Sequence, residues 1–235
     1  MLQQGEDPIA RVAVYFAPAC EGVLWHWASR VIGYDAATGE EPSPAGAAPD
    51  LPEWPSWTEE PRLYGFHATL KAPFRLAEGK RLDDVAQCAE RLAKRLAPFR
   101  IPRLDAALIG RFVALVPAEP SPALADLAAA CVREFEPLRA QLTEAERERR
   151  LEAPLTPRQT ELLDLYGYPY VLDQFRFHMT LTGKLPPERA EDVRARLAAL
   201  YAGIEPGLSV ESICLFVQPA AGARFRLHGR FALAG

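Results

Sequence analysis

One short pattern occurs twice in this chain: a histidine, any residue, a threonine and then a leucine. The two copies are His67-Ala68-Thr69-Leu70 and His178-Met179-Thr180-Leu181, in a chain of 235 residues that contains 4 His. In an extended strand, side chains two residues apart point to the same side of the sheet. Each copy is therefore expected to place an imidazole and a hydroxyl on one face. Two such strands side by side would form a symmetric His/Thr cleft.

The residues next to each copy continue the alternation of polar and apolar side chains. After the first copy, alternation predicts that Lys71 lies on the polar face. Around the second copy it predicts the same for Arg176 and Thr182. The intervening residues are apolar, so each strand has a back that packs in a core and a polar front that does not.

The order of the expected elements also repeats. After the first copy we expect a helix and two strands, over residues 82–96, 101–109 and 111–116. After the second copy we expect the same order, over residues 186–201, 208–217 and 224–233. This succession indicates an internal structural repeat, with a first unit of residues 62–117 and a second of residues 174–235.

Two further segments precede the first copy. Residues 11–17 are expected to form a strand whose apolar face carries Val12, Val14 and Phe16, with Tyr15 on the opposite face. For Tyr15, shaping the cleft and binding substrate there, and packing at the edge of the core, are both kept open. Residues 22–31 have the apolar spacing of a helix. Residues 39–61 are rich in Pro and Gly and contain two Trp, so we expect an irregular segment pinned by its aromatic side chains.

A helical insertion is expected between the two units, over residues 121–167. Its start signals are Ser121 before a proline, Thr143 in a capping box and Thr156 before a second proline. Residues 144–152 are densely charged and are interpreted as a solvated helix face without a functional role. The tyrosines around residue 168 form an aromatic loop for which both packing and covering a substrate are kept open.

Composition excludes some classes of function. With 27 Lys and Arg against 31 Asp and Glu, the formal net charge is −4, which disfavours binding of extended nucleic acid through its phosphates. The 4 Cys are scattered without the spacing of a zinc site, and we expect buried free thiols in a reducing compartment. Because the start lacks a leader pattern and no apolar run approaches about 20 residues, a cytoplasmic protein with no membrane partner is expected.

The paired histidines suggest a specific chemistry. Two imidazoles with ordinary pKa values of about 6.5 can act as a general base and a general acid near neutral pH, one accepting a proton and the other donating one. Displacement at phosphorus needs both transfers, on opposite sides of the phosphorus atom. Thr69 and Thr180 can donate hydrogen bonds to the non-bridging oxygens, and Lys71 or Arg176 can offset their charge. This scheme requires no metal and no cofactor.

These residues resemble the 2H phosphoesterase superfamily, which has two His-x-Ser/Thr motifs on related halves of a bilobal fold. The runs around residues 64–74 and 177–183 look like a bacterial branch described as phosphonate metabolism proteins. The resemblance implies an α+β fold over residues 1–235, with two pseudo-symmetric lobes of antiparallel sheet and outer helices around a central cleft. It also implies that His67 and His178 are catalytic and that Thr69 and Thr180 contact phosphate.

The resemblance further implies metal-independent cleavage or ligation of 2′,5′ or cyclic phosphodiesters. We expect a phosphodiesterase for a small cyclic or nucleotide-like phosphodiester, in phosphonate or organophosphate metabolism and without an obligate protein partner. The loop of residues 39–61 and the insertion of residues 121–167 depart from the superfamily pattern and are expected to narrow the cleft. Two alternatives are an enzyme that processes or ligates RNA ends, and a sensor of phosphate ligands without turnover.

Overall fold

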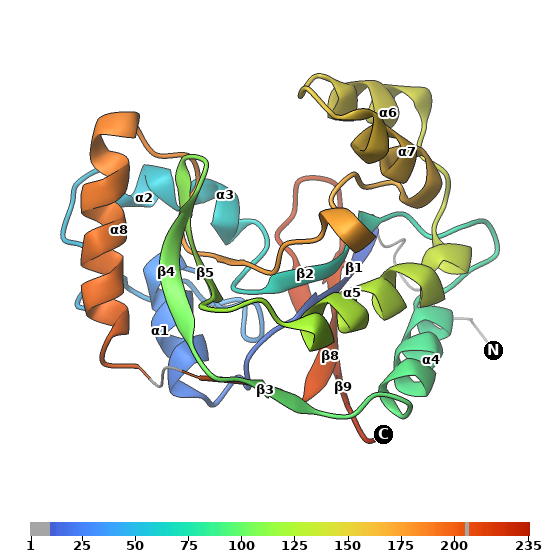
Figure 1. Ribbon diagram of the computed structural model, residues 1–235, viewed down its shortest axis with the longest axis horizontal. Helices are drawn as coiled ribbons and strands as arrows, with labels where there is room; N and C mark the ends of the chain where they lie inside the picture. Colours follow the sequence, from blue (N-terminus) through green and yellow to red (C-terminus); the bar gives the residue numbers. More distant parts are fainter. Residues whose placement is uncertain (1–9, 205–206) are drawn as a thin grey trace, which may run out of the picture.

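The computed structural model describes residues 10–204 and 207–235 and shows an α+β fold around one long antiparallel sheet (Figure 1). The order of this sheet is β4-β5-β6-β2-β1-β8-β9. The strands, in that order, are Leu104–Ile109, Phe112–Pro117, Met179–Thr180, Ala68–Phe74, Arg11–Phe16, Ser212–Gln218 and Arg226–Ala232. A separate two-stranded ladder joins β3 (Phe99–Ile101) to β7 (Leu208–Val210).

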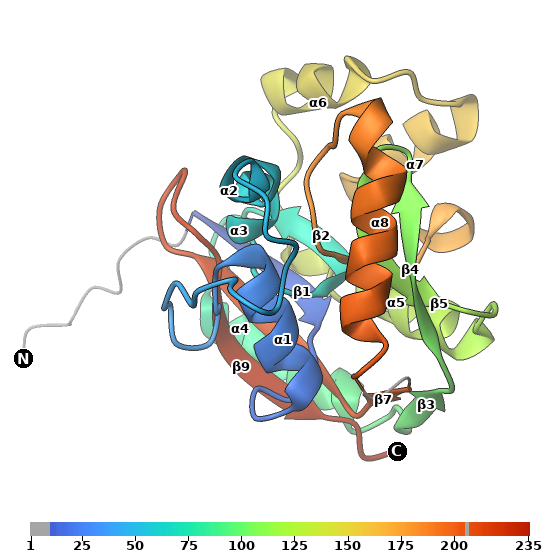
Figure 2. The same ribbon diagram turned by 90° about the vertical axis from the view of Figure 1, so that its left-hand side faces the viewer.

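Helices cover both ends of the long sheet. The helix α8 (Pro187–Tyr201) packs on β4 and β5, whereas α5 (Pro122–Glu134) packs on β2 and α4 (Leu82–Ala93) packs on β8 and β9. Figure 2 brings α8 to the front together with α1 (Val23–Ile32). No helix among residues 10–204 and 207–235 has the length and apolar character that crossing a membrane requires.

The predicted strand faces of β1 are confirmed. Val12, Val14 and Phe16 belong to the main hydrophobic cluster, whereas Tyr15 lies in a second cluster on the opposite face. Alternation identifies these faces because a strand places successive side chains on opposite sides. Tyr15 thereby reaches the same side of the sheet as the first His/Thr motif.

The segment between α1 and the first motif is irregular and pinned by aromatic side chains, as predicted. It contains two short helices, α2 (Trp54–Trp57) and α3 (Glu59–Arg62). Both tryptophans are buried, and the Trp54 indole donates a hydrogen bond to the carbonyl of Val31 at 2.8 Å. A buried aromatic ring with a satisfied N–H holds a loop in place without regular structure.

The insertion is helical and begins where its cap residues predict. It consists of α5, the 3₁₀ turn η1 (Glu136–Leu138), α6 (Glu144–Leu151) and α7 (Pro157–Tyr166). Thr143 and Thr156 each form a complete capping box, with a hydroxyl that accepts a backbone N–H of the first turn. In Figure 1 α6 and α7 project from the body of the molecule.

Two of the predicted strands are each divided in the structure. The strand expected over residues 101–109 forms β3 and β4, which are separated at Pro102 because proline has no N–H to donate to a ladder. The strand expected over residues 208–217 likewise forms β7 and β8. Three of the cysteines are buried free thiols as expected, whereas Cys20 is partly exposed.

The prediction that Lys71 lies on the polar face of the first motif is wrong. Tyr15 of β1 pairs with Thr69 of β2, and the neighbouring residue Val14 pairs with Lys71. Between these two pairs β1 advances by one residue and β2 by two, so β2 carries a bulge of one extra residue. Such a bulge moves the following side chain to the other face of the sheet. Lys71 therefore points toward α5 and is only 3% exposed.

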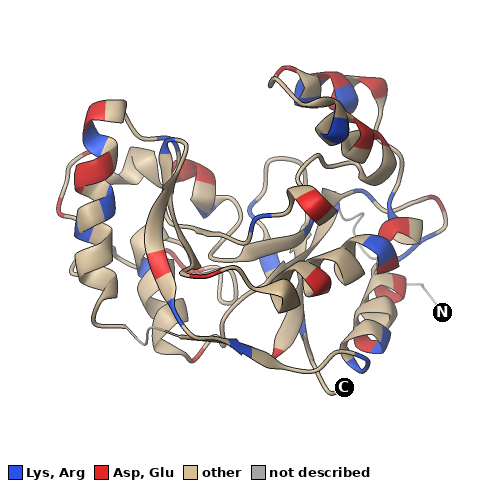
Figure 3. Ribbon diagram, viewed as in Figure 1, with Lys and Arg blue, Asp and Glu red and all other residues tan. Residues whose placement is uncertain are grey.

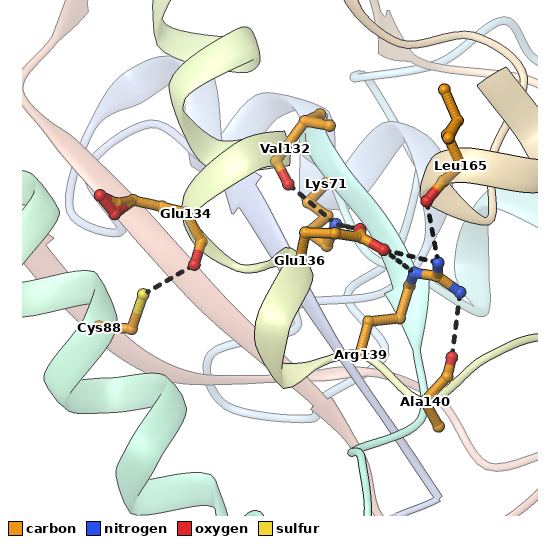
Figure 4. Close-up of polar contacts among 8 residues, drawn as sticks. All are labelled: Lys71, Cys88, Val132, Glu134, Glu136, Arg139, Ala140 and Leu165. Carbon is orange, nitrogen blue, oxygen red and sulfur yellow. Dashed lines mark hydrogen bonds and ion pairs between the residues drawn. The ribbon is translucent and has the colours of Figure 1, made fainter.

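Lys71 instead holds β2 against the end of α5 (Figure 4). Its ammonium donates to the carbonyl of Val132 at 3.1 Å and to the carboxylate of Glu136 at 2.8 Å. The guanidinium of Arg139 donates to the same carboxylate. Burial lowers the pKa of Lys71, and the hydrogen bond to Glu136 opposes this shift. Lys71 is thus a buried, paired cation with a structural role.

Candidate active site

The two His/Thr motifs lie side by side in the centre of the sheet. β2 pairs with β6 in antiparallel orientation, with Ala68 opposite Met179. Because a histidine precedes and a threonine follows the paired residue in both motifs, residue 67 comes to lie opposite residue 180 and residue 69 opposite residue 178. All four side chains share one face, since each is one position away from the paired residues.

Both imidazoles are oriented by the same local hydrogen bond. Nδ1 of His67 lies 2.8 Å from the carbonyl oxygen of Gly65, and Nδ1 of His178 lies 2.8 Å from that of Arg176. A carbonyl can only accept, so each Nδ1 carries the proton. In the neutral ring Nε2 is therefore an acceptor. The hydroxyl of Thr69 lies 3.3 Å from Nε2 of His67.

The first ring is packed between aromatic side chains. Tyr15 stacks on His67, with ring centroids 3.7 Å apart and an angle of 20° between the planes. Tyr64 approaches the same imidazole at 6.1 Å. Phe112 lies 5.8 Å from the ring of His178. These contacts restrict the orientation of the imidazoles while they exclude water from one side of each ring.

This packing favours the neutral form of both histidines. Burial lowers the pKa of His67 to about 4, the hydrogen bond to Gly65 opposes that shift, and the charge of His178 adds to it. Burial also lowers the pKa of His178, against the hydrogen bond to Arg176. At neutral pH the free protein therefore presents two neutral rings, each with an acceptor nitrogen.

The four motif side chains line one cavity of about 320 Å³, a size within the range of small-molecule sites. Tyr15 and Tyr64 line its wall beside His67. A larger cavity of about 910 Å³ adjoins it and shares Thr69, Phe112 and His178 with it. The site therefore has a small centre at the histidines and open space beside His178.

The other residues predicted for the site lie in different positions. Arg176 is exposed and lines the larger cavity, and it contributes its backbone carbonyl to the orientation of His178. Thr182 borders the smaller cavity but is fully buried, and its hydroxyl accepts the backbone N–H of Val113 at 3.0 Å. Thr182 therefore fixes the end of the second motif against β5. Lys71 lies on the opposite face of the sheet.

Sequence reasoning missed the arginines of the cavity wall. Arg150, from the charged run interpreted as a solvated face, lines the cavity together with Arg11 and Tyr168. That interpretation of the run is wrong for Arg150. Helical periodicity could not reveal it, because only the tertiary fold brings Arg150 to a cavity that Arg11 of β1 and Ala72 of β2 also line. Tyr168 comes from the aromatic loop for which covering a substrate was kept open.

Among the residues that the structure describes, no group of three or more His, Cys, Asp or Glu side chains is arranged to hold a metal ion. The polar groups that meet between the two motifs are imidazoles and hydroxyls, which are proton carriers and hydrogen-bond donors. Their arrangement suits two coupled proton transfers.

Residues 69–226 match a protein family described as "Protein of unknown function (DUF1045)". The chain belongs to this family. Two curated relatives carry the name "Ribose 1,5-bisphosphate phosphokinase PhnN". The protein from Laribacter hongkongensis is 36% identical over 92% of this chain and 50% of its own length. The protein from Janthinobacterium sp. is 38% identical over 79% of this chain and 41% of its own length. This DUF1045 chain thus spans half or less of these relatives.

Solved structures similar to this DUF1045 chain include E. coli LigT complexed with ATP, at 15% identity and a TM-score of 0.45, with 97% of this chain and 99% of LigT covered. The protein TT0787 of Thermus thermophilus is 17% identical, with a TM-score of 0.46, and the match covers 96% of this chain and 98% of that chain. A structure described as a phosphoesterase is 15% identical with a TM-score of 0.42, and the match covers 97% of this chain and 99% of that chain.

Gly65 is predicted to be essential for the geometry of His67. It has a φ of 78°, and a Cβ at this position would lie 2.6 Å from that of Ala36. Gly65→Ala should lower the free energy of unfolding by more than the ~1–2 kcal/mol of a left-handed alanine alone. It should also displace the carbonyl that orients the imidazole. Chemical denaturation measures the first effect.

Gly79→Ala is the matched control, because Gly79 has a φ of 71° with open space around its Cβ position. Its cost in stability should be limited to the strain of the left-handed backbone. Equal destabilisation by the two substitutions would contradict the account of Gly65.

Proposed function

We propose that this protein is a metal-independent phosphodiesterase of the 2H type that acts on a small cyclic or nucleotide-like phosphodiester. The observation that carries the proposal is the mirrored pair His67 and His178 in one cavity, each with Nδ1 held by a carbonyl and Nε2 left as an acceptor. Paired imidazoles fixed in this way provide a general base and a general acid at a single phosphorus atom.

In the proposed reaction a water molecule attacks phosphorus, a new P–O bond forms and the bond to the leaving oxygen breaks. Nε2 of one histidine takes a proton from the water. Nε2–H of the other, which binds the substrate as an imidazolium, gives a proton to the leaving oxygen. Both rings keep their Nδ1–H on the carbonyls of Gly65 and Arg176 throughout.

The hydroxyls of the two motifs stabilise the charge that develops on phosphate. Thr69 and Thr180 line the same cavity as the histidines, and we assign them hydrogen bonds to the non-bridging oxygens. Such bonds are stronger in a desolvated site than in water. The negative substrate also favours the protonated form of one buried histidine, which compensates for the desolvation that lowers its pKa.

A small substrate is supported by the walls of the site. Glu60 and Pro61, from the loop before the first motif, and Arg150, from the insertion, line the cavity of about 320 Å³. These are the two segments expected to narrow the cleft. The name of the curated relatives, a phosphokinase of ribose 1,5-bisphosphate, supports a sugar phosphate and a role in phosphonate or organophosphate metabolism.

A second candidate is the processing of RNA ends. It is favoured by the larger cavity, whose wall includes Phe112, Tyr168, Tyr170 and Phe175. Aromatic side chains of this kind stack on unpaired bases. The acidic net charge of −4 weighs against a long nucleic acid, so the second candidate is restricted to a nucleotide or a short end.

The test of the proposal is turnover followed by phosphorus NMR in the presence of EDTA. The substrates are ribose 1,2-cyclic phosphate, nucleoside 2′,3′-cyclic phosphates and 2′,5′-linked dinucleotides. The double variant His67→Ala/His178→Ala should lose turnover by a factor of about 10³ or more, because both proton carriers are removed. His26→Ala, which alters an exposed histidine of α1, is the control and should keep full activity.

Loss of all wild-type turnover on chelation would contradict metal independence. Failure to convert any of these diesters, together with tight binding of a phosphate ligand, would instead favour a sensor without turnover. Undiminished turnover by the double variant would show that the histidines do not carry the reaction.

The pH dependence of kcat/KM follows from the two lowered pKa values. Turnover needs one ring protonated and one neutral, which in the free enzyme holds between the two pKa values of the pair. Burial places both pKa values below 6.5, with that of His67 at about 4. We therefore expect a bell-shaped profile with its optimum on the acid side of pH 6.5. An optimum above about pH 7.5 would contradict the burial of the pair.

A further inference from the structure

An arginine-rich cavity adjoins the cavity of the two histidines. It measures about 240 Å³, and we call it the arginine pocket after the residues Arg11, Arg75, Arg139, Arg149 and Arg150 in its wall. Arg11, Arg150 and Tyr168 line both cavities. A ligand group in the arginine pocket would thus be a direct neighbour of a phosphate held between the histidines.

Two of the arginines in this wall already bind a carboxylate. Arg75 binds Glu146 through two hydrogen bonds, of 3.1 and 2.9 Å. Arg139 binds Glu136, which also receives Lys71. Among the described residues, Glu146 is the single carboxylate in the wall of the pocket, and Arg75 occupies it. No further carboxylate of the described wall is therefore left to pair with the other arginines.

Arg11 and Arg150 have no carboxylate among the ion pairs of the described residues. The guanidinium of Arg11 donates to the neutral amide of Gln218 at 2.7 Å and lies over the ring of Phe225. That of Arg150 lies over the ring of Tyr168, 5.2 Å from its centroid. These contacts fix the positions of the two side chains and leave their charges unbalanced.

The electrostatics of the pocket agree with this geometry. Burial lowers the pKa of Arg150, and Tyr168 and Glu146 oppose this shift. The positive charge of Arg11 lowers the pKa of Arg150 as well, so the two cations are close enough to repel each other. An anion between two partly desolvated guanidinium groups removes this repulsion and forms charge-assisted hydrogen bonds with both.

Charge on the rest of the insertion is distributed differently. Basic and acidic residues are interspersed on α6 and α7 in Figure 3. Arg147, on the same helix as Arg150, binds Asp164 through two hydrogen bonds on the exposed side. The unbalanced charge of Arg150 therefore belongs to its position at the cavities, and it does not extend to its whole helix.

We propose that Arg11 and Arg150 form an anion subsite for a second phosphate group of the substrate, beside the phosphodiester cleaved at His67 and His178. This inference rests on the proposed function and deepens it. The substrate class becomes a small cyclic phosphodiester that carries a phosphate monoester elsewhere on the same sugar. Hydrolysis leaves a product with two phosphate monoesters, so a reaction that consumes the product acts on a sugar bisphosphate.

The test compares substrates that differ only in the second phosphate. Ribose 1,2-cyclic phosphate and adenosine 2′,3′-cyclic phosphate are each assayed with and without a phosphate on the 5-position. For at least one of the two pairs, the wild type should have a kcat/KM about 10-fold or more higher with the 5-phosphorylated substrate than with the unphosphorylated one. This ratio of kcat/KM values corresponds to the effect of a charge-assisted hydrogen bond. Arg150→Gln, Arg11→Gln and the double variant should reduce this ratio by about 10-fold or more.

Arg147→Gln is the control, since it removes the same charge from α6 outside the cavities, and its ratio should equal that of the wild type. A wild-type ratio near one for both substrate pairs would overturn the proposal. An unchanged ratio in the Arg11 and Arg150 variants would overturn it as well.

A binding experiment separates this proposal from the proposed function. Calorimetry measures the affinity of ribose 5-phosphate for the His67→Ala/His178→Ala variant, with and without Arg11→Gln/Arg150→Gln. An affinity about 10-fold or more lower without the arginines supports the subsite even if the wild type hydrolyses no diester, in which case only the proposed function fails. Equal affinities would overturn the subsite, whatever the turnover.

Discussion

The pairing of β2 with β6 at Ala68 and Met179 is the constraint on which the site depends. Neither strand segment forms a cleft alone, because each supplies one imidazole and one hydroxyl. The antiparallel register converts two copies of one sequence pattern into a symmetric set of four side chains. A shift of one residue would turn one copy toward the core and destroy the arrangement. The apolar side chains between the polar ones oppose such a shift, since they are buried on the other face.

The local hydrogen bonds of the two histidines fix the orientation of the rings that the strand register brings together. Pairing brings the rings together, and the carbonyls of Gly65 and Arg176 determine which nitrogen of each ring remains an acceptor. Burial by Tyr15 on one side and Phe112 on the other then sets the proton affinity. The proposed catalysis therefore depends on strand register, side-chain orientation and desolvation.

Sequence reasoning was most successful where one physical rule decides the outcome. Period-2 alternation correctly placed His67 and Thr69 on one face, and capping boxes correctly marked the starts of α6 and α7. It failed for Lys71 because a bulge reverses the alternation two residues after Thr69. It failed for Arg150 because helical periodicity separates the faces of a helix but does not reveal which neighbours cover them. Both failures concern charged side chains whose partners are distant in sequence.

The tautomeric state of the two imidazoles tests the proposed site most directly, and ¹⁵N NMR reports this state through the chemical shifts of the ring nitrogens. We expect His67 and His178 both to be neutral at pH 7 with the proton on Nδ1, and we expect addition of a phosphate ligand to protonate Nε2 of one ring. A proton on Nε2 with a bare Nδ1 in either neutral ring would contradict this result, because that Nδ1 could then not donate to the carbonyl of Gly65 or Arg176 that orients the ring.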